Sequence, residues 1–122
     1  MKIFKCPVCG NVVYLLDEKS SNLICCGKNM ILLKENENDG IIEKHVPVYE
    51  ITDNNISITV GSVKHVMEED HYIEFIMYVC KENVFIKYLK PFDEPKAIFP
   101  YLGNGVIYEY CNKHGLWKKN MN

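Results

Sequence analysis

The sequence contains no arginine, and lysine supplies all 14 of its basic residues. Nucleic-acid-binding proteins rely strongly on the planar arginine side chain for specific contacts to bases and phosphates. The formal net charge of −2 also gives no excess of positive charge to attract a polyanion. A nucleic-acid partner is therefore not expected.

Long hydrophobic runs are missing as well. The stretch from Met1 to Cys6 has no apolar segment of the kind found in secretory signals, and runs such as Phe75–Cys80 are too short to span a bilayer. The sequence predicts a cytoplasmic protein with no membrane partner. In that reducing compartment, closely spaced cysteines bind metals more often than they form disulfides.

A polar run, Lys34–Gly40, contains no apolar residue and divides the 122-residue chain into two predicted domains, 1–36 and 37–122. The first is too small to fold around an apolar core, so a bound metal would have to organise it.

The second domain has no long helical pattern. Ile56, Ile58 and Val60 alternate with polar residues, and further segments rich in β-branched and aromatic residues are separated by turn signals. We therefore expect a mainly β protein whose larger part is an antiparallel β-sandwich.

Four cysteines near the start form two pairs of different kinds. Cys6 and Cys9 are separated by two residues and followed by Gly10, which is the spacing of a metal-binding knuckle. Cys25 and Cys26 are adjacent, so they cannot form a second such knuckle and should distort a tetrahedral site. Four thiolates suit zinc or iron, and the spacing does not choose between them.

The four histidines and one further cysteine form a second candidate site. Its members are His45, His65, His71, Cys111 and His114. His65 and His71 can share an ion only if the chain bends between them, and Met67–Asp70 provides a plausible loop. Five donors exceed the four of a closed zinc site and fit an iron ion that prefers six, with one position open for a small ligand.

Lysines precede three of the histidines, as Lys44, Lys64 and Lys113. Where these lysines lie on loops, they would form a basic collar that attracts a small anion.

Two other interpretations compete with an iron enzyme. The strand leading to Cys111 and His114 also suits an electron carrier of the blue-copper type, although it has too many histidines and no obvious axial methionine close after His114. A zinc-ribbon interaction module would explain the four early cysteines but would leave the histidines unused.

Motifs spread over the whole chain resemble those of the desulfoferrodoxin family, the two-iron type of superoxide reductase. They are the spacing of Cys6, Cys9, Cys25 and Cys26, then Glu43-Lys44-His45-Val46-Pro47, Gly61-Ser62-Val63-Lys64-His65, His71-Tyr72-Ile73-Glu74 and Tyr110-Cys111-Asn112-Lys113-His114-Gly115-Leu116-Trp117. One departure is Val66, where relatives commonly have proline, and it removes no ligand.

The resemblance implies a desulforedoxin-like or rubredoxin-like domain followed by an immunoglobulin-like sandwich, with two iron ions per chain. Cys6, Cys9, Cys25 and Cys26 would hold the first iron. His45, His65, His71 and His114 would be equatorial ligands of the second iron, with Cys111 as its axial ligand. The resemblance also implies a homodimer.

The activity implied by the resemblance is the one-electron reduction of superoxide to hydrogen peroxide. Superoxide would approach the open position opposite Cys111, attracted by Lys44, and Glu43 would take the sixth position of the oxidised iron as product leaves. A rubredoxin or another reductase would return the electron.

Overall fold

Every regular element in the described part of the chain is a β-strand, which confirms the predicted fold class. The computed structural model describes residues 2–20, 22–37 and 45–122. They form two compact units, Met1–Lys34 and Glu35–Asn122. In these ranges we find no helix with the length and apolarity that a membrane crossing requires.

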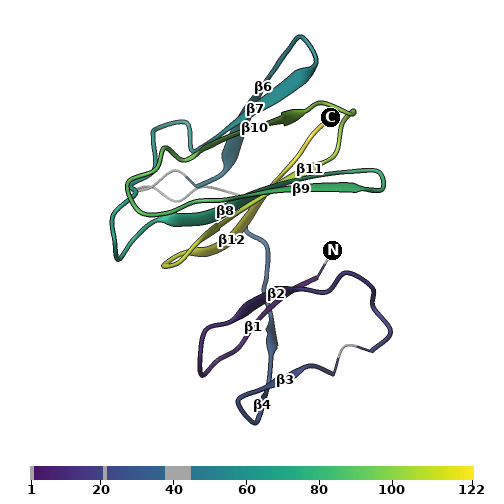
Figure 1. The fold of residues 1–122 in the computed structure, drawn as a ribbon, viewed down its shortest axis with the longest axis vertical. Coiled ribbons are helices and arrows are strands. Elements are labelled where there is room, and N and C mark those ends of the chain that lie inside the picture. Colours follow the sequence, from purple (N-terminus) through teal and green to yellow (C-terminus); the bar gives the residue numbers. More distant parts are fainter. Residues whose placement is uncertain (1, 21, 38–44) are drawn as a thin grey trace. The chain divides into compact units, whose positions relative to one another are not determined.

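The first unit is built from very short strands (Figure 1). Its sheet has the order β2-β1-β5, and β3 and β4 form a separate hairpin. The strands are β1 Ile3–Lys5, β2 Val12–Tyr14, β3 Ile24–Cys25, β4 Lys28–Asn29 and β5 Ile31–Leu32. Ile24, Ile31 and Leu32 each remain more than half exposed, so β3 and β5 contribute little to an apolar core, whereas Ile3 and Phe4 of β1 are buried.

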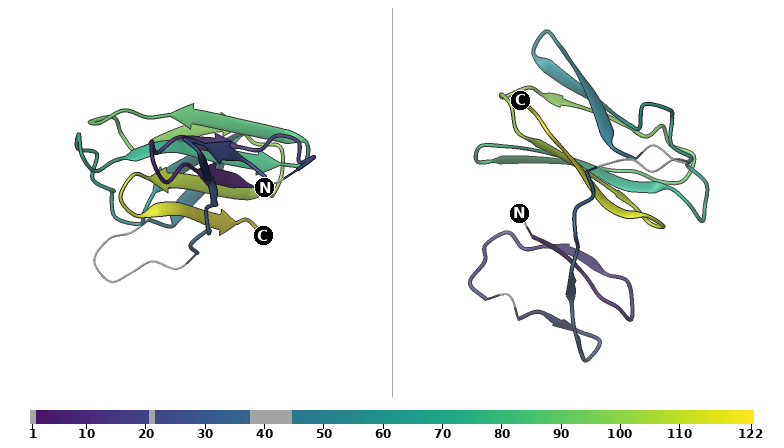
Figure 2. Two further views of the ribbon diagram at one scale, coloured as in Figure 1. Left: turned by 90° about the horizontal axis from the view of Figure 1, so that it is seen from below. Right: turned by 180° about the vertical axis from the view of Figure 1, so that it is seen from behind.

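The second unit consists of two antiparallel sheets, with strand orders β10-β7-β6 and β12-β11-β8-β9. Figure 2 shows their arrangement from two further directions. The strands are β6 Pro47–Thr52, β7 Asn55–Val60, β8 Ile73–Cys80, β9 Asn83–Tyr88, β10 Lys96–Pro100, β11 Val106–Cys111 and β12 Gly115–Asn120. Asn36 extends this unit toward its N-terminal side, because its backbone N–H and C=O bond to Leu116 and Lys118, both at 2.9 Å.

The core of the second unit lies between its two sheets. As the period-two pattern predicted, Ile56, Ile58 and Val60 are fully buried on the inner face of β7. From the other sheet, Ile76 and Tyr78 of β8 pack into the same cluster. The alternation of β7 therefore sets which side of its sheet faces the core.

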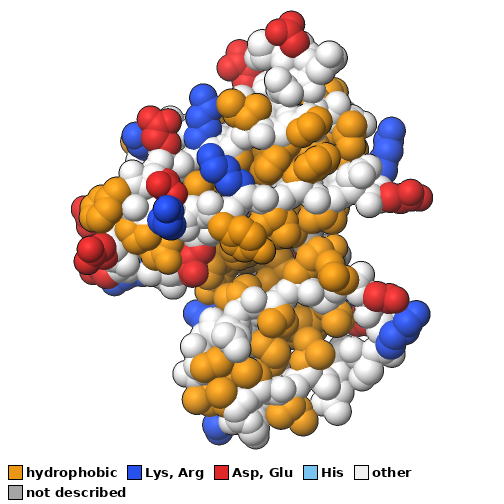
Figure 3. Space-filling view, viewed as in Figure 1, with side chains coloured by type: hydrophobic (Ala, Val, Ile, Leu, Met, Phe, Trp, Pro, Cys, Tyr) orange, Lys and Arg blue, Asp and Glu red, His pale blue; other side chains and the backbone are white. Residues whose placement is uncertain are grey.

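Part of the surface of this unit is apolar. Figure 3 shows hydrophobic side chains along its strands, whereas acidic side chains lie mainly at the ends of the unit. Exposed members include Val84 and Ile86 on β9 and Ile98 on β10. β9 is also an edge strand, a position from which a second chain could extend the sheet.

A buried tyrosine ties the inner layer to a loop at the far end of β8. The Tyr78 hydroxyl donates to the Gly103 carbonyl and accepts a hydrogen bond from the Leu102 N–H at 3.1 Å. Its ring stacks on Phe85 and Phe99. Burial raises the pKa of Tyr78, so the hydroxyl stays protonated and able to donate.

We expect Tyr78→Phe to lower the free energy of unfolding of the second unit by about 1–3 kcal/mol, because two backbone groups lose their partner. Denaturant titration followed by the fluorescence of Trp117, the single tryptophan, measures this directly. Tyr88→Phe, at a side chain that is 77% exposed, is the matched control. Equal unfolding free energies for the two variants would contradict the assignment.

Candidate metal centres

The loop after β1 folds around the sulfur of Cys6. The N–H groups of Val8 and Cys9 both point at this sulfur, at 3.4 Å, and Gly10 donates its N–H to the Cys6 carbonyl at 3.1 Å. Gly10 has φ +81°, a conformation that suits glycine. These features are those of the metal-binding knuckle that the spacing predicted.

The adjacent cysteines lie on the turn of the β3–β4 hairpin. Cys26 and Gly27 occupy its two central positions with φ of 54° and 72°, as in a type I′ turn. Because of this left-handed conformation, two neighbouring cysteines can present their sulfurs to one point. The sequence did not reveal this turn, although Cys26-Gly27 between two short strands is its signal.

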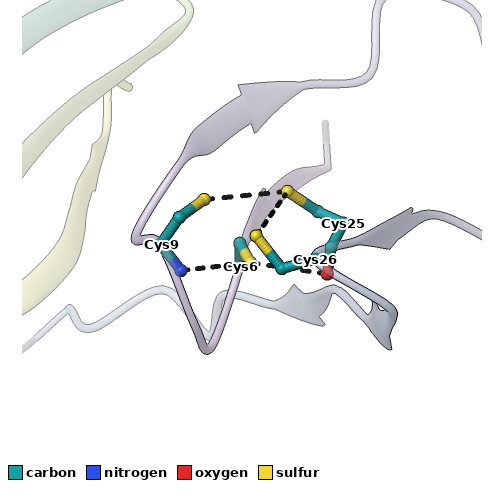
Figure 4. A group of neighbouring side chains, drawn as sticks. All are labelled: Cys6, Cys9, Cys25 and Cys26. Carbon is teal, nitrogen blue, oxygen red and sulfur yellow. Dashed lines mark hydrogen bonds between the residues drawn. The ribbon is translucent and has the colours of Figure 1, made fainter.

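The four sulfurs converge as Figure 4 shows. The Sγ atoms of Cys9 and Cys25 lie 3.7 Å apart, those of Cys25 and Cys26 lie 4.0 Å apart, and all four fall within 4.8 Å of one another. Sulfurs bound tetrahedrally at about 2.3 Å from one ion would be about 3.8 Å apart. The four-cysteine group therefore fits a single ion.

Hydrogen bonding already favours a thiolate in this group. The Cys9 N–H, followed by the Val8 N–H, lowers the pKa of Cys6 to about 6. A hydrogen bond to Cys6, with further help from Cys9, raises the pKa of Cys25 to about 12, so these two thiols do not ionise together unaided. A cation that replaces their protons removes this conflict.

The second group of donors gathers at one end of the sandwich. His45 precedes β6, and His65 and His71 lie on the connection from β7 to β8. Cys111 is the last residue of β11, and His114 immediately precedes β12. Antiparallel pairing brings the start of β6 beside the end of β7, and the start of β8 beside the end of β11. Both sheets thus contribute ligands to one place.

The four imidazole rings form a closed cycle. Their centroids are separated by 4.6 Å for His45 and His65, 5.0 Å for His65 and His71, 5.1 Å for His71 and His114, and 4.8 Å for His114 and His45. The chain makes the bend needed between His65 and His71, because Glu68 and His71 exchange two backbone hydrogen bonds. Each histidine therefore has two others as neighbours.

The distances within the cycle suit a six-coordinate ion. His65 Nε2 lies 3.0 Å from His45 Nε2, and neighbouring nitrogens on an octahedral ion with bonds of about 2.1 Å would be about 3.0 Å apart. His65 Nδ1 lies 2.6 Å from the Val66 carbonyl, which favours a proton on Nδ1 and leaves Nε2 for the metal. The ligand atoms of His45, His71, Cys111 and His114 all lie within 4.8 Å of one another.

The thiol of this group is fully buried. Cys111 has no exposed surface, and its sulfur lies 3.8 Å from His114 Nδ1. Trp117 stacks on His45 with ring centroids 4.6 Å apart and donates its Nε1–H to the His114 carbonyl at 3.1 Å. The indole thus contacts two of the ligand segments, a role that its position near Cys111 in the sequence did not specify.

Two predicted residues lie outside the described part of the chain. They are Glu43 and Lys44, the proposed sixth ligand and the proposed attractor of superoxide. The remaining cysteine, Cys80, is buried in the sandwich core, with its sulfur 3.6 Å from the Asn104 carbonyl, and belongs to neither donor group.

The fold and these donors define a small all-β metalloprotein with two separate metal-binding groups. The desulfoferrodoxin family model matches residues 37–120, and the model of the desulfoferrodoxin N-terminal domain matches residues 1–33. Desulfoferrodoxin from Nitratidesulfovibrio vulgaris is 49% identical over 118 residues, which cover 96% of this chain and 94% of that protein.

Two solved structures extend the comparison. Superoxide reductase from Treponema pallidum has a TM-score of 0.82 and 24% identity, with coverage of 98% of this chain and 97% of that one. The one-iron superoxide reductase from Giardia intestinalis has a TM-score of 0.56 and 30% identity, with coverage of 66% and 98% respectively. The first likeness, at 24% identity, bears on the fold alone.

The chain belongs to the desulfoferrodoxin family. Its four-cysteine group and its histidine–cysteine group, in which the ligand atoms of His45, His71, Cys111 and His114 converge, correspond to two iron centres. His65 borders the second group, with its Nε2 3.0 Å from His45 Nε2. This resolves the choice between zinc and iron that the cysteine spacing left open.

We expect Cys9→Ser to weaken metal binding at the four-cysteine group and to loosen the first unit, because its short strands depend on the metal for a core. The histidine–cysteine group should keep its iron. Metal content per chain and limited proteolysis within residues 2–33 measure the two effects, with Cys80→Ser as control. A Cys9→Ser protein that is as metal-loaded and protease-resistant as the wild type would rule out this dependence.

Proposed function

We propose that this chain is a superoxide reductase, in which the sandwich unit carries the reaction and the first unit carries a rubredoxin-like iron. The observation that supports it most is the closed cycle of four imidazoles beside one buried cysteine sulfur. Held by these residues, ferrous iron would supply the single electron that, together with two protons, converts superoxide into hydrogen peroxide. Solved relatives that share the fold bear the name superoxide reductase.

The donor count argues for chemistry rather than for a closed structural site. Four imidazoles and one thiolate leave one position of an octahedral ion open to a small ligand. The four imidazoles and the Cys111 thiolate would hold the iron, and the thiolate would push electron density onto it. Burial of Cys111 keeps water from the sulfur and so preserves this effect.

The same geometry disfavours the two alternatives. A blue-copper carrier uses two histidines and one cysteine, whereas here four imidazoles approach one another. A zinc-ribbon module has no use for this second donor group at all. No observation favours either reading over superoxide reduction.

Lys44 and Glu43 are part of the proposal because of their positions in the sequence next to His45. Lys44 immediately precedes His45, a member of the cycle, and its ammonium would attract superoxide and stabilise the negative charge that develops during reduction. Glu43 would occupy the sixth position after oxidation and help the product to leave.

A rubredoxin or similar reductase is the proposed electron donor, and the cytoplasm is the proposed location. We also propose a homodimer. The exposed apolar side chains of Val84, Ile86 and Tyr88 on the edge strand β9 support self-association of this kind.

We predict that Lys44→Ala lowers the second-order rate of superoxide consumption on the order of tenfold at low ionic strength, and that it reduces the salt dependence of that rate. Both iron contents should stay unchanged. Stopped-flow or pulse-radiolysis kinetics provide the measurement. Lys119→Ala, at an exposed position toward the other end of β12, changes the net charge equally and should leave the rate near wild type. An unchanged rate in Lys44→Ala would refute its role.

We predict that Cys111→Ser abolishes turnover, because the axial thiolate is lost while a neutral hydroxyl takes its place. Peroxide production with an external reductant is the assay. Cys80→Ala removes a buried thiol outside both metal groups and should retain activity. Wild-type turnover in Cys111→Ser would count against the axial assignment.

A further inference from the structure

Asn112, the residue after Cys111, makes three hydrogen bonds to the two residues that flank His71. Its Oδ1 accepts from the Tyr72 N–H at 2.9 Å, and its Nδ2 donates to the Asp70 carbonyl at 3.0 Å. Its backbone N–H donates to the Tyr72 carbonyl at 3.2 Å. One residue therefore joins the loop of Cys111 and His114 to the segment that carries His71.

This junction lies where the regular strand pairing fails. β8 and β11 pair residue by residue up to Phe75 and Tyr110, but the register then shifts so that Cys111 lies opposite Ile73. Beyond this irregularity, the ladder alone no longer fixes how Cys111 sits relative to His71. The three hydrogen bonds of Asn112 connect the two chain segments across this register shift.

The chemistry of the contact requires an amide side chain. The Tyr72 N–H needs an acceptor and the Asp70 carbonyl needs a donor, and asparagine offers both in one plane at the correct reach. The same partners fix which atom of the amide is oxygen. Aspartate would keep the acceptor but would lose the donor, and alanine would lose both.

The His71 backbone is held from its other side as well. Its N–H and C=O both bond to Glu68, at 3.2 and 2.8 Å, which closes a tight turn. The turn shapes the segment, but it does not connect His71 to the loop that carries Cys111 and His114. Asn112 supplies that connection through Asp70 and Tyr72.

We propose that Asn112 is a positioning residue of the histidine–cysteine group, which clamps the backbone on both sides of His71 and so sets the placement of this ligand relative to Cys111. Outer partners that orient metal ligands typically change metal affinity by about 10- to 100-fold when removed. The inference rests on the metal assignment within the proposed function, but not on the identity of the substrate.

The test compares Asn112→Ala and Asn112→Asp with wild type in the full-length, iron-loaded protein. Three quantities are measured: the rate of iron release from the histidine–cysteine group to a chelator, the energy of the visible thiolate-to-ferric-iron charge-transfer band, and hydrogen exchange of the peptide that contains Tyr72. Asn104→Ala is the matched control, since it removes an asparagine that accepts from the Tyr101 hydroxyl at 3.1 Å in another loop.

In Asn112→Ala we expect iron release to accelerate on the order of tenfold, the charge-transfer band to shift, and exchange at Tyr72 to rise. In Asn112→Asp we expect faster iron release and a shifted band, whereas Tyr72 keeps its acceptor and its slow exchange. Asn104→Ala should resemble wild type in all three measurements.

Wild-type iron release and an unshifted band in both Asn112 variants would overturn the inference. So would an equal acceleration of iron release in Asn104→Ala, which would reveal general loosening rather than positioning. If wild-type protein bound iron in this group but did not reduce superoxide, the proposed function would fail while these readouts still decided the role of Asn112.

Discussion

The antiparallel packing of two sheets is the constraint on which the convergence of four imidazoles and one thiol at one end of the β-sandwich depends. Ligands that are distant in the sequence can meet there because antiparallel strands begin and end side by side. The buried faces of β7 and β8 fix the sheets against each other, so the connections beyond their ends are held in place. Packing in the core therefore determines distances within the donor group.

The two units are stabilised by different kinds of interaction. The second unit buries a continuous apolar cluster between two sheets, whereas the first has strands of two or three residues and several exposed apolar side chains. In the first unit the sulfurs themselves approach one another, and amides directed at Cys6 prepare it to bind a cation. A metal ion there would supply the organisation that apolar burial supplies in the sandwich.

Much of this architecture could be predicted from residue patterns. The alternation of Ile56, Ile58 and Val60 identified an inward-facing strand, and the spacing of Cys6 and Cys9 identified the knuckle, because both depend on local geometry. The order of the imidazoles around their cycle could not be predicted, since it depends on how two sheets pack. The contacts of Asn112 were equally hidden, because its partner Tyr72 is 40 residues away and the strand register between them is irregular.

The stoichiometry of superoxide consumption tests the central claim most directly. Iron-loaded protein should be given superoxide and an external reductant while peroxide and dioxygen are both measured. A superoxide reductase forms a peroxide for every superoxide consumed and releases no dioxygen, and this is the result that the account predicts. Enzyme-dependent release of dioxygen in proportion to peroxide would indicate dismutation, and no acceleration of superoxide loss would indicate an electron carrier; either result would contradict the account.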